Sequence, residues 1–165
     1  MTRRSRAREV ALQLLFQFDS NPSVNRAVQE QFVRDRLHEP SLEPFCLGLF
    51  DGVQAHRQEI DKQLTEAAEN WRLQRMAGVD RNVLRMGAYE LMFVPEIPPS
   101  AALDEAIELA RRYGSKDSPS FVNGVLDRVA ELRALQAASI QPSAEPAPEG
   151  DAPQSESQNS TADIH

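Results

Sequence analysis

Residues 79–94, VDRNVLRMGAYELMFV, decide the fold, because no other helical segment of this chain is apolar around so much of its circumference. Two neighbouring rows of apolar residues recur in it at helical spacing: Val83, Gly87, Leu91 and Val94, and beside them Leu84, Ala88 and Met92. A helix with so wide an apolar face is expected to be central, and Gly87 allows a neighbour to approach it closely. We expect Asp80 to cap its start and Pro95, which has no backbone N–H, to end it.

Three charged side chains interrupt this apolar surface, namely Arg81, Arg85 and Glu90. A long charged side chain in a crowded helix needs a carboxylate or a carbonyl as a partner, because an unpaired buried charge is costly. The sequence therefore predicts interior or interface ion pairs at these three positions.

Six further segments carry apolar residues at helical spacing: residues 5–19, 23–37, 42–53, 54–70, 101–113, and a last one that opens at Asp117 or Ser118. Start and stop residues bound several of them, with Asn21-Pro22-Ser23 before the second and Ser100 and Gly114 around the sixth. No segment alternates polar and apolar residues over the length of a strand. The sequence predicts an all-α fold, a helical bundle of about seven helices with short connections.

The chain divides into a body, residues 1–138, and a tail, residues 139–165. With 41% hydrophobic residues in 165, the body has enough apolar side chains for one domain. The tail is rich in Pro, Ser, Glu, Gln and Ala, a composition that predicts disorder. It holds five of the 25 acidic residues and none of the 18 basic ones, so most of the net charge of −7 lies there.

The first eight residues contain Arg3, Arg4, Arg6 and Arg8, here called the arginine arm, and no acid. These cations open the first helix, where they meet the positive pole of the helix dipole, and such an arrangement favours an external anion. A solvated chain start is the ordinary explanation of a charge run, and nucleic-acid binding is the specific one.

Several function classes find no support in the sequence. The single cysteine, Cys46, excludes a disulfide framework within the chain and fits a reducing compartment, and there is no apolar run of about 18 residues, so we expect a soluble cytoplasmic protein. Asp104 and Glu105 are adjacent in a helix and point about 100° apart, so they do not converge on one substrate. Without nucleotide-binding motifs or spaced metal ligands, we expect no catalysis, no cofactor and no metal.

Three stretches together resemble the NusB family of bacterial transcription antitermination factors. They are RRSRAREVALQLLFQ, WRLQRMAGVDRNVLRMGAYEL and ALDEAIELARRYGSKDSPSFVNGVLDRV, in this order, covering most of residues 3–133. The N-terminal domain of certain RNA cytosine methyltransferases is similar too, but those enzymes need a cofactor-binding α/β domain downstream, where this chain has its acidic tail.

The resemblance implies two three-helix halves packed together, with the DRNVLR helix beginning the second. It also implies that the protein binds the single-stranded boxA segment of nascent RNA together with NusE, a ribosomal small-subunit protein. That complex would then join RNA polymerase and the other Nus factors.

Single-stranded RNA is held by cations on phosphates, planar side chains on bases and amides on base edges. The residues carried over from the family for RNA contact are Arg4, Arg6, Arg8, Gln13, Phe16, Asp117, Phe121 and Asn123. Structural roles remain open for four of them: Phe16 and Phe121 as core residues, Asp117 as a helix cap, and Asn123 as a partner of a backbone group. Ser5 and Ser120 stand where relatives can carry basic residues.

For the contact with NusE the resemblance favours the central helix, and Tyr89 and Glu90 are the predicted residues. The alternative to an RNA-binding adaptor is a protein-interaction or homodimerisation module. In such a module the arginine arm would pack on another subunit.

Overall fold

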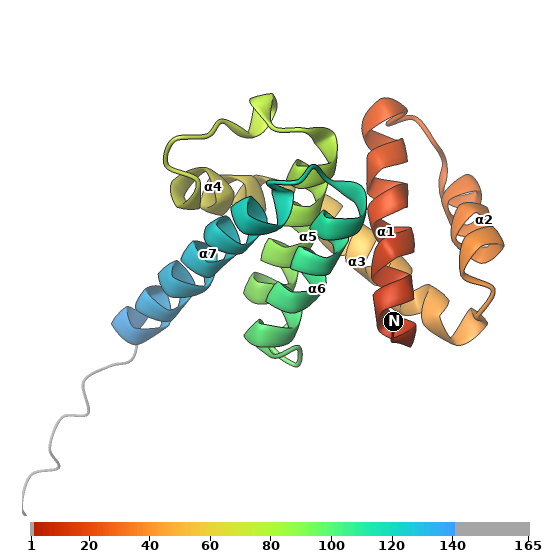
Figure 1. Cartoon of the computed structure of the whole chain (residues 1–165). Helices are drawn as coiled ribbons and strands as arrows, with labels where there is room; N and C mark the ends of the chain where they lie inside the picture. The colour runs from red at the N-terminus through yellow and green to blue at the C-terminus, as the bar shows by residue number, and fades with distance from the viewer. Residues whose placement is uncertain (1, 141–165) are drawn as a thin grey trace, which may run out of the picture.

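The structure, a computed structural model, describes residues 2–140, and these residues form seven α-helices and two 3-10 turns with no strand (Figure 1). The helices are α1 (Arg3–Ser20), α2 (Arg26–Leu37), α3 (Glu43–Ala55), α4 (Arg57–Ala67), α5 (Gly78–Phe93), α6 (Pro99–Tyr113) and α7 (Ser118–Ile140). The 3-10 turns are Pro40–Leu42 and Leu73–Arg75. The predicted all-α class and the number of helices are confirmed.

The helices form two groups that share α5. α1 packs against α2 and α3, whereas α6 and α7 pack against each other and against α5, and α4 lies along α5 and α7. α5 also contacts α1 and α3, so it touches every other helix except α2. The prediction that this helix is central is confirmed, and Figure 1 shows it between the two groups.

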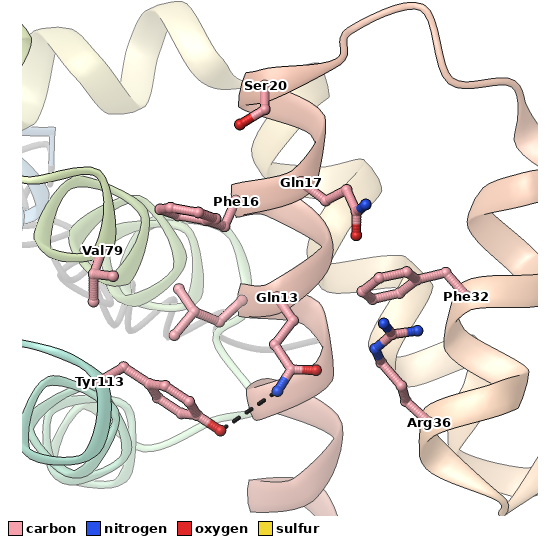
Figure 2. Close-up of a pocket in the computed structure, with 9 residues that line it drawn as sticks. Gln13, Phe16, Gln17, Ser20, Phe32, Arg36, Val79 and Tyr113 are labelled. Atoms are coloured by element: carbon pink, nitrogen blue, oxygen red, sulfur yellow. Dashed lines mark hydrogen bonds between the residues drawn. The ribbon is translucent and has the colours of Figure 1, made fainter.

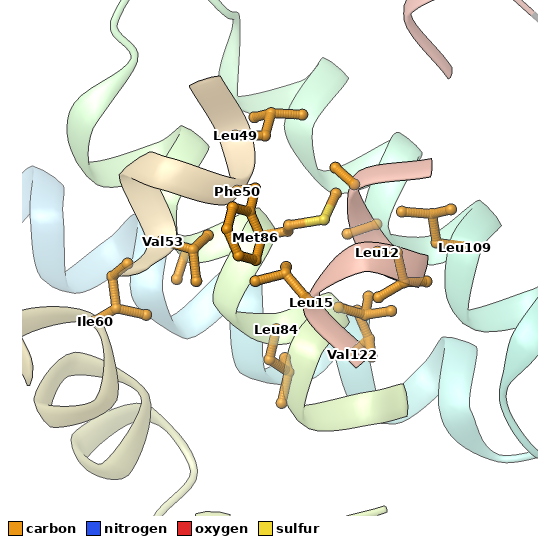
Figure 3. Packing of buried hydrophobic residues seen from close by; sticks show 14 of the residues in the cluster. Leu12, Leu15, Leu49, Phe50, Val53, Ile60, Leu84, Met86, Leu109 and Val122 are labelled. Atoms are coloured by element: carbon orange, nitrogen blue, oxygen red, sulfur yellow. The ribbon is translucent and has the colours of Figure 1, made fainter. Parts of the chain in front are cut away.

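One hydrophobic core runs through both groups (Figure 3). Leu15 of α1 and Phe50 of α3 meet Leu84 and Met86 of α5, and Val122 approaches from α7. Each of these side chains is at most 3% exposed. Burial of this kind contributes about 1.5–3 kcal/mol for each large apolar side chain, so the core fixes how α1 sits relative to α7.

The predicted ion pairs around α5 are confirmed. Arg85 donates through Nε and Nη2 to the Asp61 carboxylate of α4 at 2.8 and 3.0 Å. Glu90 accepts from Arg8 of α1. Arg81 donates to the carbonyl of Leu73 at 3.3 Å, and its Nη2 lies 3.9 Å from Asp19 Oδ2 of α1. The charged side chains of the central helix therefore tie it to its neighbours.

Several predicted helix starts are wrong. α5 begins at Gly78 without a side-chain cap, so Asp80 lies in the first turn. There its negative charge interacts favourably with the positive end of the helix dipole. The Asn25 side chain accepts from the Val28 N–H at 3.1 Å, and this bond places the start of α2 after Ser23. α6 begins at Pro99, so Ser100 is not its cap.

The predicted tail begins two residues too early, because Ser139 and Ile140 belong to α7. The other predicted tail residues, 141–165, lie outside the described residues. None of the described helices is both long enough and apolar enough to cross a membrane.

Gly87 allows a close approach, as predicted. A Cβ at this position would lie 2.6 Å from Leu126 Cδ1 of α7 and 3.4 Å from the Cβ of Ala106 on α6. Leu126 is fully buried and cannot move aside freely. The absence of a side chain at Gly87 therefore sets the distance between α5 and α7.

Gly87→Ala is expected to lower the free energy of unfolding by about 1–2 kcal/mol. The added methyl group would overpack the contact between α5 and α7, and this destabilises the protein more than the higher helix propensity of alanine stabilises it. Gly48→Ala is the matched control, since nothing lies within 4 Å of a Cβ built there in α3. That change is expected to stabilise the protein by up to about 1 kcal/mol. Urea unfolding of both variants measures the difference, and equal stability would contradict this account of α5 packing.

Candidate nucleic-acid interface

The arginine arm starts α1, and two of its four members form ion pairs with Glu39 and Glu9. Arg3 pairs with Glu39 and donates to Ser41 at 3.0 Å. Arg6 pairs with Glu9 at 3.0 Å. Arg4 is exposed, its guanidinium lies 4.9 Å from the centre of the Phe45 ring, and it makes no ion pair within residues 2–140. The arm therefore offers less free positive charge than its sequence implies.

Arg8 and Glu90, predicted to contact RNA and NusE respectively, instead bind each other. Arg8 Nε and Nη2 lie 2.7 and 3.0 Å from the two Glu90 oxygens, and the side chains are only 6% and 3% exposed. Because this turn of α1 faces α5, both side chains are buried in their mutual ion pair and neither lies on the accessible surface. Burial raises the pKa of Glu90, although its hydrogen bonds with Arg8 act in the opposite direction.

A groove of about 650 Å³, here called the α1 groove, lies over the exposed face of α1 (Figure 2). Phe16 lies in it and is 50% exposed, so the core alternative for this residue is wrong. Gln13 Nε2 donates to the Tyr113 hydroxyl of α6 at 3.5 Å, and that hydroxyl binds Glu9. The prediction thus placed Gln13 and Phe16 correctly on one accessible face.

A second hollow, of about 320 Å³, lies where α7 begins and is called the α7 pocket here. Its aromatic residues are Phe121 of α7 and Trp71, which precedes the second 3-10 turn, with ring centres 5.5 Å apart in an edge-to-face arrangement. Trp71 is 61% exposed. Arg75 and Asp117 also line the pocket. Phe121 is partly buried and packs against the core, so its core role is partly borne out, while Trp71 beside it is exposed. An aromatic pair of this kind beside a cation is a platform suited to an unstacked base.

The start of α5 joins the two hollows. A Cβ at Gly78 would lie 3.2 Å from the Phe16 ring, the next residue, Val79, lines the α1 groove, and the preceding residue, Ala77, lines the α7 pocket. Arg6 and Phe16 are ten residues apart in α1, which is about 15 Å along the helix. The arginine arm and Phe121 are thus connected through the groove, but they are not neighbours.

The two remaining predicted RNA contacts, Asp117 and Asn123, differ in their position: Asp117 lines the α7 pocket, and Asn123 does not. Asp117 is exposed, and its carboxylate makes no hydrogen bond within the described range, so it is not the side-chain cap of α7 there. Asn123 is exposed too but lines neither hollow. Because two residues of a helix turn through about 200°, Asn123 and Phe121 point to nearly opposite sides of α7. One base cannot touch both.

Among the residues of this surface that were not predicted from the sequence are Phe32, Arg36, Trp71 and Arg75. Phe32 and Arg36 line the α1 groove from α2. Trp71 is the single tryptophan of the chain and stands between helices in the stretch WRLQR, which also contains Arg75. An exposed tryptophan among arginines was the available indication, whereas nothing in the sequence places α2 beside this face of α1.

Two other candidate positions have structural roles. Tyr89 is partly exposed at the far end of α5, where its ring stacks with Phe93 at 5.9 Å between centres and covers Gly52. Burial raises the pKa of the Cys46 thiol to about 12, so at neutral pH it is not a nucleophile. Cys46 is therefore an unreactive small residue of the core.

The family model of the NusB family matches residues 5–131 of this chain. The chain belongs to the NusB family. Transcription antitermination protein NusB of Sorangium cellulosum is 48% identical over 131 residues, which are 79% of this chain and 94% of that protein. The Myxococcus xanthus protein of the same name is 41% identical over 79% of this chain and 96% of its own length.

Solved NusB structures agree with the fold. T. maritima NusB superimposes with a TM-score of 0.69 at 36% identity, covering 79% of this chain and 92% of that one. A structure of antitermination factors NusB and NusE in complex with dsRNA gives a TM-score of 0.71 at 25% identity, over 80% and 98% of the two chains.

Proposed function

We propose that this NusB-family protein is a transcription antitermination factor that binds boxA-type RNA of nascent transcripts together with NusE. In this role it is an adaptor of the RNA polymerase complex in the cytoplasm, and not an enzyme. The observation that carries the proposal is the pair of the exposed Trp71 and the partly buried Phe121, which stands beside Arg75 and is linked to the α1 groove. The relative solved with NusE and dsRNA supports NusE and an RNA as partners.

The electrostatics of the surface suit a single RNA strand. Arg4 lies at one end, Arg36 beside the groove, and Arg75 and Lys116 near the α7 pocket, and all four are exposed. None of them forms an ion pair within residues 2–140. The sequence analysis gave the phosphate contacts to arginines of the arm alone, and the structure adds Arg36, Arg75 and Lys116 as candidates. Phosphate contacts provide most of the affinity of such surfaces.

For NusE the proposal keeps Tyr89 and drops Glu90, which is buried against Arg8. Tyr89, Phe93 and His56 form a partly exposed stack at the junction of α3 and α5, with His56 and Phe93 ring centres 3.9 Å apart. Partly exposed aromatic side chains are typical centres of protein interfaces. We place the NusE contact around Tyr89.

The salt dependence of RNA binding tests the proposal. With three or four phosphates neutralised, the logarithm of the affinity for a boxA-like RNA is expected to fall against the logarithm of salt concentration with a slope of about −2 to −3. Arg4→Ala and Arg75→Ala are each expected to make that slope shallower by about 1. Fluorescence anisotropy with and without NusE measures it.

Arg26→Ala is the matched control, since Arg26 is also exposed but binds Asp51 away from this surface, at 2.6 and 2.9 Å. It should leave the slope unchanged. A flat salt response of the unaltered protein, with or without NusE, would favour a protein-interaction or homodimerisation module.

A further inference from the structure

The α1 groove has a floor and two walls that come from different parts of the fold (Figure 2). Its floor is one face of α1, made by residues at helical spacing: Leu12, Gln13, Phe16, Gln17 and Ser20. Phe32 and Arg36 of α2 form one wall, while Val79 and Tyr113 form the other. Its volume of about 650 Å³ lies within the usual range of small-molecule sites, about 300–1,000 Å³.

The side chains of this groove present the three kinds of group that hold an unstacked base. Phe16 offers a half-exposed ring, and the Arg36 guanidinium lies 3.6 Å from the centre of the Phe32 ring, so its outer face is a charged plane. Within residues 2–140 neither the Arg36 guanidinium nor the Gln17 amide has a polar partner. Planar faces stack on bases, and free amides read their edges.

The groove also lies on the route of an RNA strand. At one border Arg6 Nη2 donates to the main-chain oxygen of Arg36 at 3.2 Å, so the arginine arm touches the end of α2. At the other border Phe16 packs on Gly78, beyond which lies the α7 pocket. The groove therefore lies between the arginine arm and the α7 pocket, in line with a strand that contacts both of them.

We propose that the α1 groove binds one unstacked nucleobase of the RNA strand, and that Phe32 and Arg36 of α2 form the wall on which this base stacks. This inference rests on the proposed function and extends the RNA surface to a helix that neither the sequence nor the family resemblance assigned to it. Continuity with the proposed RNA surface and the unpaired positive charge of Arg36 favour a nucleic acid as the occupant.

The test uses the full chain and a boxA-like RNA that carries 2-aminopurine at one position at a time, because stacking on a planar side chain quenches this base. The variants are Arg36→Gln, which alters an exposed side chain, and Phe32→Leu, which keeps an apolar residue under it. Arg34→Gln is the matched control, since Arg34 is an exposed arginine of α2 that does not line the groove. Phe121→Leu reports on the α7 pocket, and circular dichroism verifies folding.

Arg36→Gln and Phe32→Leu are each expected to lower RNA affinity about 5- to 30-fold and to relieve quenching at the same one or two positions of the RNA. Arg34→Gln should relieve quenching at no position, and Phe121→Leu should act at different ones.

Three results would overturn the inference, and they are distinguishable. Unchanged affinity and quenching in Arg36→Gln and Phe32→Leu, with loss in Phe121→Leu, would leave the proposed function intact but remove the base site. If light scattering shows that the unaltered chain self-associates and that these two variants do not, while their RNA binding is intact, the groove is a contact between two copies. If the unaltered chain binds no RNA with or without NusE, the proposed function itself fails.

Discussion

Arg8→Met is expected to lower the free energy of unfolding by about 3–5 kcal/mol at neutral pH, the cost of leaving one member of a buried ion pair without its partner. Glu90, 3% exposed in its side chain, would then be a buried carboxylate with its two hydrogen bonds from Arg8 lost, while Glu105 and Arg4 still act on its charge. Urea unfolding followed by circular dichroism measures the change.

The pH dependence separates this cause from a simple loss of packing. Burial already raises the pKa of Glu90 above its ordinary value of 4.5, and Arg8 opposes that rise, so the variant should have a still higher pKa at Glu90. A carboxyl group with a raised pKa in the folded state favours folding when protonated, and this contribution is lost as pH rises through the raised value. The stability difference between the unaltered protein and Arg8→Met should therefore widen from about pH 4.5 to pH 7.

Arg26→Met provides the matched control, because Arg26 and Asp51 have the same two-bonded geometry but side chains 47% and 50% exposed. Removing that pair should cost no more than about 1 kcal/mol. The double variant Arg8→Met/Glu90→Leu should recover much of the lost stability. An Arg8→Met protein with a pH-independent loss, or with the small loss expected of Arg26→Met, would contradict a role for this buried pair.

The Arg8–Glu90 pair also shows where sequence reasoning succeeds and where it ends. Periodicity identified α5 as central and indicated that Glu90 needs a partner, because both follow from local spacing and from the cost of burying charge. It did not indicate that the partner is Arg8, 82 residues earlier in the chain. Only the packing of α1 on α5 turns one arginine of a basic run inward while Arg4 stays exposed.

The same limit applies to the RNA surface. Phe16 and Phe121 were predicted because each stands in a stretch that resembles the family, and both reach the proposed surface. Phe32 and Arg36 belong to no such stretch, and their place depends on how α2 folds back on α1. The predicted start of α2 was wrong for a local reason. The Asn25 side chain, and not Ser23, accepts the hydrogen bond from a free N–H at the start of this helix.

Trp71→Ala and Phe121→Ala are each expected to weaken RNA binding about 5- to 150-fold, the effect of one lost base-stacking platform. The two rings touch at 5.5 Å between centres, so the double variant should lose less than the product of the single effects if both rings hold the same base. Because no charge is removed, the slope of affinity against salt should not change, in contrast to Arg75→Ala. Anisotropy titrations at several salt concentrations measure both quantities.

Leu135→Ala is the control for removing an exposed apolar side chain, since Leu135 is 64% exposed on α7 and lines neither hollow. It should bind RNA as the unaltered protein does. Trp71 is itself so exposed that its removal should leave the fold intact, and a lost affinity can then be assigned to the surface. If Trp71→Ala and Phe121→Ala bind normally while Arg4→Ala does not, the strand contacts the α1 end alone, and the α7 pocket has no part in holding it.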